Sequence, residues 1–313
     1  MSRMKHKHRD EIQKAMQRHE SRRLLTDKII TGVTIACVVA AIIPLGSILF
    51  EVIKNGAGAI NAEFLTQPQG AIGEGTGGVG PAIQGTVLIV ALASLIGVPI
   101  GVLAGIYLSE FGNNGRFSYF VRFFNNVMTG LPSIVIGIVG YIVLVLTIGS
   151  FNIMAGAVAL SIIMIPIVVG VTEETIKLVP NSIREAGYSL GIPKWKITMF
   201  ITLRSAKNGV LTGIVLAISR IAGETAPLIL TILGTSLFFN SFLGPVDALP
   251  LRILRLATQP YPSAHSFGWG AALILIILVM TLSIALRFLV LERRFRLSHI
   301  SRVLRRNANE TTS

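Results

Sequence analysis

Residues 185–191 read Glu185-Ala186-Gly187-Tyr188-Ser189-Leu190-Gly191, a short run rich in small residues inside a basic, polar loop. Very hydrophobic stretches lie on both sides of this loop. After Pro180, Ser182 followed three residues later by Glu185 forms a capping-box pattern that starts a helix. Gly191 is suited to end that helix, and Ile192-Pro193 then starts a second one. We therefore expect two short helices with a glycine corner, which together form a rigid knob.

The flanking stretches are those of a membrane protein. Mean hydropathy is +0.70 over 313 residues, and only 14% of the residues are charged. About 20 consecutive apolar residues cross a bilayer core as a helix. Six such spans can be drawn, near residues 29–53, 82–109, 125–147, 151–171, 207–233 and 269–291. The sequence therefore predicts an all-α polytopic membrane protein with six transmembrane helices.

The positions of Lys and Arg predict how the chain is oriented, since these residues accumulate in cytoplasmic loops. Of the 28 Lys and Arg residues, 23 fall on one side of the drawn spans. We expect both termini to be cytoplasmic, with a basic segment at 1–28, a transmembrane domain at 29–291 that includes a cytoplasmic loop at about 172–206, and a basic tail at 292–313. The net charge of +13 is then a topology signal that suits anionic lipid headgroups, and no nucleic-acid partner is expected.

Several negative inferences narrow the function. The single cysteine, Cys37, allows no intrachain disulfide. No G-x-x-x-x-G-K-[ST] sequence occurs, so we expect no nucleotide bound by a P-loop. No metal site, cofactor or catalytic residue is predicted.

Small residues and prolines recur within the predicted spans. Gly97, Gly101 and Gly105 repeat every four residues, a spacing that allows close helix approach. Pro99 and Pro132 are candidates for bends near a transport path. In the external loop at 234–268, Leu249 to Thr258 is expected to form a short amphipathic helix that presents Arg252 and Arg255, either to an external partner or to solvent.

A charged pair lies inside the fifth predicted span, in the stretch Arg220-Ile221-Ala222-Gly223-Glu224-Thr225. A charge at the centre of a membrane helix costs about 2.5–3.5 kcal/mol on insertion scales. Residues four apart share one face of a helix, so Arg220 and Glu224 can pair. Two interpretations stay open: a self-neutralising ion pair that pins the helix to its neighbours, and a polar lining of a transport path, in which Arg220 offers planar donors that suit an oxyanion and Thr225 adds a hydroxyl.

Several stretches together resemble a known family. The acid-small-small start at Glu185, Ala186 and Gly187, with Gly191 six residues after the acid, is similar to the EAA loop of ABC-importer permeases. The run from Arg220 to Pro227 resembles the fifth-helix signature of phosphate-specific ABC permeases. Further matches to that family are Gly77 to Pro81 with Gly85-Thr86, Gly97 to Gly101 running into Ala104 to Glu110, Gly130 to Val135, and Ala248 to Pro250.

The resemblance covers about residues 75 to 290 and implies a type I ABC-importer permease (MetI-like) architecture in a prokaryotic inner membrane. It implies a non-catalytic permease subunit of an ATP-driven phosphate importer. Its expected partners are a second permease, two copies of a separate ATPase and an extracytoplasmic phosphate-binding protein. In that family the EAA loop docks on the ATPase, so Glu185, Ala186, Gly187 and Gly191 are the expected coupling residues, and Arg220, Glu224 and Thr225 the expected substrate path.

The sequence departs from the family pattern at two positions. Gly187 stands where alanine is usual, and Arg204 stands where a proline often ends the motif. The alternatives are an ABC permease for another oxyanion such as molybdate or sulfate, an ion-coupled anion carrier or channel in which Glu224 relays protons, and a subunit that also reports phosphate status. No inverted repeat is visible, and a carrier or channel would have no use for a coupling loop.

Overall fold

Helices account for almost all of the regular structure in the computed structural model. It describes residues 2–70, 76–112 and 115–310, and side chains within these ranges from residue 26 to residue 288. The chain divides into two units, Met1–Lys54 and Asn55–Ser313. The first unit consists of most of helix α1 (Ser2–Gly56), which contains an apolar stretch, Thr26–Ala59, long enough to cross a membrane. Most side chains of the predicted basic segments 1–28 and 292–313 lie outside the described residues.

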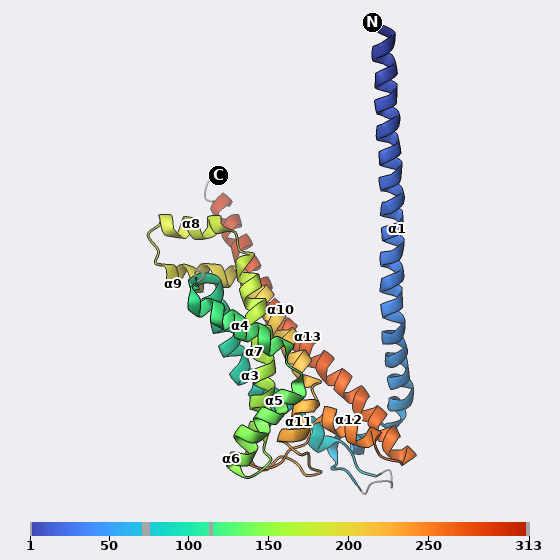
Figure 1. The fold of residues 1–313 in the computed structure, drawn as a ribbon. Helices are drawn as coiled ribbons and strands as arrows, with labels where there is room; N and C mark the ends of the chain where they lie inside the picture. Colours follow the sequence, from blue (N-terminus) through green and yellow to red (C-terminus); the bar gives the residue numbers. More distant parts are fainter. Residues whose placement is uncertain (1, 71–75, 113–114, 311–313) are drawn as a thin grey trace. The chain divides into compact units, whose positions relative to one another are not determined.

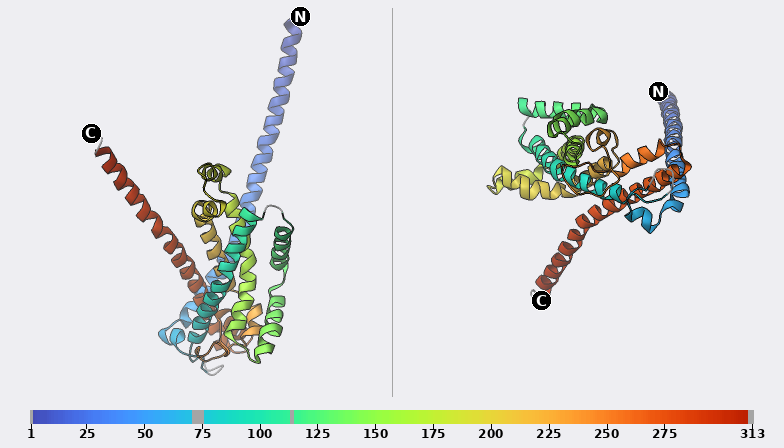
Figure 2. Two further views of the ribbon diagram at one scale, coloured as in Figure 1. Left: turned by 90° about the vertical axis from the view of Figure 1, so that its left-hand side faces the viewer. Right: turned by 90° about the horizontal axis from the view of Figure 1, so that it is seen from below.

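The second unit is a helical bundle (Figures 1 and 2). Helices α8 and α9 lie at one end of it, and α6, α11 and α12 lie at the other (Figure 1). Its helices are α2 (Ala62–Thr66), α3 (Gly80–Ile106), α4 (Arg116–Gly130), α5 (Ser133–Gly140), α6 (Leu146–Ile148), α7 (Ile153–Lys177), α8 (Asn181–Ser189), α9 (Lys194–Lys196), α10 (Leu203–Ala222), α11 (Ala226–Thr231), α12 (Leu249–Ala257) and α13 (Pro262–Glu310). Short 3₁₀ or π-helical segments lie between them: η1 (Ala57–Ala59), η2 (Tyr107–Phe111), η3 (Tyr141–Val145) and η4 (Ile197–Thr202).

The prediction of an all-α chain with six membrane spans is confirmed in its class and needs correction in two spans. Among the described residues, five helices are long and apolar enough to cross a membrane, and a bent pair makes six if it is counted as one span. That pair replaces the single helix predicted at 125–147: α4 and α5 meet at 104°, because Pro132 lacks a backbone N–H and interrupts the helix. The helix predicted at 207–233 is also broken, between Ala222 and Ala226.

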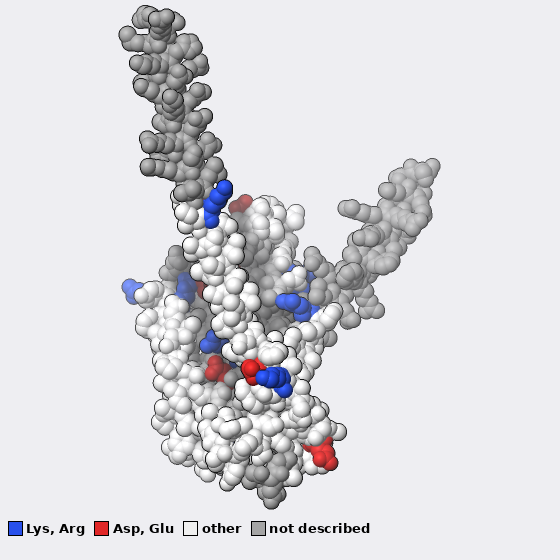
Figure 3. All heavy atoms as spheres, turned by 90° about the vertical axis from the view of Figure 1, so that its right-hand side faces the viewer, with Lys and Arg blue, Asp and Glu red and all other residues white. Residues whose placement is uncertain are grey.

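On the face shown in Figure 3, charged side chains are sparse among the described residues.

Helix α7 is the most deeply buried of the candidate spans, and α3 packs closely along it because glycines line its side of the contact. A β-carbon on Gly101 would lie 2.7 Å from Cβ of Val168, and one on Gly105 would lie 2.6 Å from Cβ of Thr172. The third glycine of the series, Gly97, faces Met164 in the same way. The predicted close approach at this four-residue spacing is therefore confirmed, and its partner is α7.

Replacing Gly101 with alanine should destabilise the bundle, because the added β-carbon forces α3 and α7 apart. Overpacking of this kind costs about 1–3 kcal/mol, so Gly101→Ala is expected to lower the Tm of the purified protein. Gly170→Ala on α7 is the matched control, since a β-carbon there has no heavy atom within 4 Å and alanine favours the helix. Equal melting curves for the two variants would contradict the packing described here.

At the opposite end of α3 from α8, the amphipathic helix predicted at Leu249 to Thr258 is present as α12. Its predicted display of Arg252 is wrong. The Arg252 side chain is 4% exposed, pairs with the fully buried Asp247 at 2.5 Å and donates a hydrogen bond to the Thr235 carbonyl. The Leu249 N–H also bonds to Thr86 Oγ1 of α3. Burial raises the pKa of the Asp247 carboxyl, and the Arg252 guanidinium opposes that shift. The pair therefore holds the start of α12, and the bonds to Thr235 and Thr86 fix α12 to the bundle.

Removing one member of this pair should be more harmful than removing both. A single Arg252→Met substitution leaves the Asp247 carboxylate buried without its hydrogen-bonded cation and with only the weaker charge interaction of Arg255, and the loss of a buried partner reaches about 3–5 kcal/mol. We expect Asp247→Asn combined with Arg252→Met to recover part of the lost thermal stability. Additive losses in the double variant would show that the two side chains are not coupled.

Candidate functional site

The predicted knob exists, and its first helix ends as the sequence indicates. Gly191 follows α8 with φ of 72°, a left-handed conformation that glycine adopts without steric cost. The Gly191 N–H donates to the Tyr188 carbonyl and the Ile192 N–H donates to the Gly187 carbonyl. This pair of hydrogen bonds defines a Schellman motif. The corner predicted at Gly191 is therefore confirmed.

Two details of the predicted knob are wrong. Ser182 does not cap α8: the helix begins at Asn181 after Pro180, and no side-chain cap bond is present there. The second short helix is not separate, because α9 continues through η4 into α10 as one helical stretch from Lys194 to Ala222. The knob is thus a hairpin between α8 and the first turns of this long helix. The segment between the end of α7 and the start of α9, which contains α8, is residues 178–193.

The four predicted coupling residues divide by exposure. Glu185, Ala186 and Gly191 are exposed. Gly187 is buried, and a β-carbon there would lie 2.9 Å from Cδ1 of Ile197. The small residue at position 187 therefore lets α8 pack closely on η4, while Glu185 and Ala186 face outward, with the exposed Tyr188 and Trp195 on the same hairpin.

The three predicted path residues lie at the break in the fifth span. Helix α10 ends at Ala222, Gly223 and Glu224 make turn-type backbone bonds to Arg220 and Ile221, and Thr225 precedes α11. The prediction that Arg220 and Glu224 lie one turn apart on a single helix is wrong, because the helix ends at Ala222, before Glu224. The structure nevertheless keeps them near each other, with Arg220 Nε 3.9 Å from Glu224 Oε1.

This ion pair is loose. The distance is at the limit of a salt bridge, and the Arg220 side chain is 63% exposed, whereas Glu224 is 17% exposed. Within the part of the chain that the structure describes, the Arg220 guanidinium donates no hydrogen bond. A cation that pins a helix to its neighbours is expected to be buried and fully bonded. The geometry therefore favours a guanidinium that is available to a ligand over a self-neutralising structural pair.

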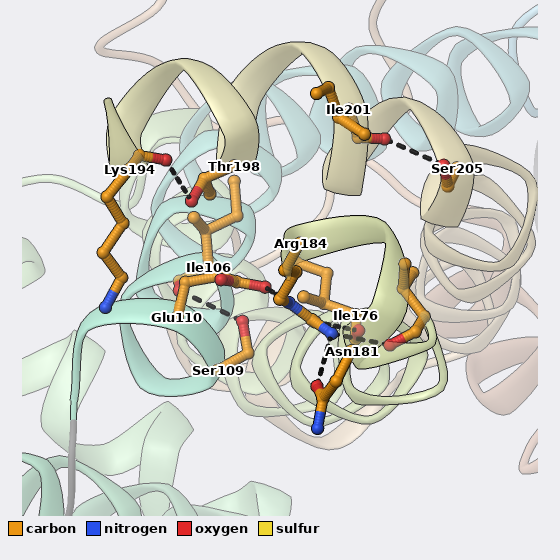
Figure 4. A network of polar contacts seen from close by, with 11 residues as sticks. Ile106, Ser109, Glu110, Ile176, Asn181, Arg184, Lys194, Thr198, Ile201 and Ser205 are labelled. Atoms are coloured by element: carbon orange, nitrogen blue, oxygen red, sulfur yellow. Dashed lines mark hydrogen bonds and ion pairs between the residues drawn. The ribbon is translucent and has the colours of Figure 1, made fainter. Parts of the chain in front are cut away.

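Sequence reasoning missed a polar network at the α8 end of the bundle (Figure 4). Arg184 of α8 bonds to the buried Glu110 of η2 at 2.8 Å. A second set joins Arg122 and Lys177 to Glu173 at 2.9 Å and 2.6 Å, and Arg122 also donates to the Leu108 carbonyl. In the sequence these cations were counted only as topology signals. The available sign was an acid at the end of a span, Glu110, facing a basic loop.

The fold and these features define a polytopic helical membrane protein with an exposed helical hairpin. The model of the family described as binding-protein-dependent transport system inner membrane component matches residues 97–297. The chain belongs to this family.

Similar proteins agree with that assignment. The chain is 37% identical over 247 residues to the phosphate transport system permease protein PstA of Yersinia pestis, an alignment that covers 79% of this chain and 84% of that protein. It is 39% identical over 261 residues to the protein of the same name from Haemophilus influenzae, covering 83% and 92%. A chain of the inward-facing MetNI methionine ABC transporter shares the fold, with a TM-score of 0.54 at 19% identity over 68% of this chain and 92% of that one. The predicted MetI-like architecture is therefore confirmed.

The corner of the hairpin gives a prediction about assembly. A β-branched residue at Gly191 is strained at positive φ, by about 1–2 kcal/mol, so Gly191→Val should distort the hairpin. If the hairpin docks on an ATPase subunit, less of that subunit should co-purify with the tagged chain. Gly191→Asn is the control, because asparagine tolerates this conformation. Equal recovery of co-purifying protein with both variants would contradict a role for the corner in docking.

Proposed function

We propose that this chain is a permease subunit of an ATP-driven importer of inorganic phosphate. It forms the translocation path with a second permease, couples to two copies of a separate ATPase and receives phosphate from an extracytoplasmic binding protein. The observation that carries the proposal is an exposed, loosely paired Arg220 at a helix break, in a chain whose relatives named above are phosphate transport permeases.

Arg220 suits the substrate on chemical grounds. A guanidinium presents planar N–H donors that match two oxygens of a phosphate at once. Glu224 balances this charge between substrate visits and accepts a hydrogen bond from a protonated phosphate oxygen. Thr225 supplies a further hydroxyl at the break. Alternating access exposes this region first to the outside and then to the cytoplasm.

The hairpin has a separate task. Glu185 and Ala186 face a groove of the ATPase, and the hairpin is continuous with α10, which carries Arg220. Movement of the ATPase therefore reaches the path through one helix. The chain supplies no catalytic group, both termini lie in the cytoplasm, and ATP is hydrolysed on the partner.

Two experiments address the class of transporter. A pull-down of the tagged chain from native membranes in mild detergent should recover a second permease and a P-loop ATPase, whereas a chain recovered alone, from a preparation that keeps other complexes intact, would favour a carrier or channel. Competition by molybdate and sulfate against labelled phosphate separates the oxyanions. Strong inhibition by either would move the proposal to that anion.

Arg220→Gln should abolish phosphate uptake without preventing assembly. Glutamine keeps the polarity of the exposed side chain but removes the charge and the forked donors. Assembly is checked by the same pull-down, and Lys54→Gln, which removes an exposed cation paired with Glu51, serves as the control with normal uptake. Normal uptake by Arg220→Gln would exclude the role assigned to Arg220.

A further inference from the structure

Glu110 is a buried carboxylate at the end of the helix that packs along α7. Its side chain is 5% exposed, and it lies in η2, the π-helical turn that extends α3. A buried carboxylate is costly unless it is paired and hydrogen-bonded. A neutral residue would end the helix at this position without that cost, so we infer that the charge of Glu110 serves a specific contact.

Its partner, Arg184, uses all of its donors. Nε and one Nη2 hydrogen bond go to Glu110 Oε1, at 3.0 and 2.8 Å. The other Nη2 bond goes to the Ile176 carbonyl at 2.9 Å, and Nη1 bonds to the Val179 carbonyl and to Asn181 Oδ1. A guanidinium has five N–H donors; here two bond the end of α3, two bond carbonyls at and just after the end of α7, and one bonds Asn181 within α8 (Figure 4).

The neighbouring residue in α8 faces the other way. Glu185 is exposed, whereas the Arg184 side chain is 15% exposed. Consecutive positions of one helix thus meet the outside of the hairpin and the interior of the bundle. A displacement applied to the outer face of α8 therefore acts directly on Arg184.

Helix α3 continues this connection to the region of Arg220. Its residues Ile89, Val90 and Ala93 belong to the same buried cluster as Ala217, Ile218 and Ile221 of α10. Arg220 lies between the last two of these α10 positions. A displacement of α3 is therefore passed through this cluster to the packing directly beneath the path residues.

We propose that the Glu110–Arg184 ion pair is a positioning link that makes α8 and α3 move together, and thereby sets how tightly ATP hydrolysis is coupled to transport. The inference rests on the proposed function. It adds a route through α3 to the route through the helix that joins the hairpin to Arg220. The pair is buried, and two guanidinium donors bond the same carboxylate oxygen. A surface ion pair would need neither burial nor this fixed geometry.

The test measures ATP hydrolysed per phosphate imported. The complex, containing this chain, its second permease and its ATPase, is reconstituted in liposomes with phosphate-loaded binding protein. Glu110→Gln keeps the shape of the side chain and removes its charge, and Arg184→Lys keeps the charge and removes the fork. We expect both to raise the ratio at least threefold in complexes that assemble normally. Glu174→Gln, which alters an exposed carboxylate near the same end of α7, should leave it unchanged.

The outcomes distinguish a failure of the proposed function from a failure of the Glu110–Arg184 link. No phosphate uptake by the wild-type complex would overturn the proposed function, and the inference with it. With normal wild-type uptake, an unchanged ratio in both variants, or hydrolysis and uptake that fall in proportion, would overturn the link alone. Failure of both variants to assemble would also overturn it, because the pair would then serve folding and not coupling.

Discussion

The close contact between α3 and α7 is the constraint on which the rest of the bundle depends. Inside a bilayer, lipid tails are as apolar as leucine, so helices associate through tight packing and not through exclusion of water. Glycines on α3 bring its backbone against Val168 and Thr172. Helix α10 approaches α7 similarly, since β-carbons on Gly209 and Gly213 would lie against Thr175 and Val171. Three helices therefore form one tightly packed unit around α7.

Three arginines show how this unit uses charge. Arg252 is buried against Asp247 and Arg184 against Glu110, at opposite ends of α3. Arg220 differs, with an exposed side chain and a partner 3.9 Å away. Buried, hydrogen-bonded guanidinium groups fix elements in place, whereas an exposed one without hydrogen bonds can exchange its partner for a ligand at small cost. The residue type alone does not separate these roles, and the surroundings do.

The sequence allowed the fold class, the family, the glycine contact of α3 and the corner at Gly191 to be predicted, because each depends on local pattern or spacing. The bend at Pro132 was predicted only as a possibility within a single span, and the break at Gly223 was not predicted, since hydropathy averages over a span and does not register where its backbone turns. The burial of Arg252 was missed for a related reason: the amphipathic pattern of α12 identifies a helix but does not show that Asp247, just before it, and the Thr235 carbonyl bond its cation. The contact between Glu110 and Arg184 joins residues 74 positions apart, so no local pattern contains it.

The break at Gly223 also explains how Arg220, which we propose to lie on the path, is compatible with a rigid bundle. Up to Ala222, α10 is fixed by its contacts with α7 and by the Ser219–Ser283 hydrogen bond to α13. Beyond it, Gly223 and Glu224 are held by single turn-type bonds. Helix α11 packs on α5, where Gly137 meets the backbone of Pro227, and on α7, where Gly156 lies against Leu228. Arg220 thus stands on the last turn of one rigid element and Glu224 on the connection to another. Relative movement of α10 and α11 changes the separation of these two charges without unfolding either helix, and so connects the helix packing to the availability of the guanidinium.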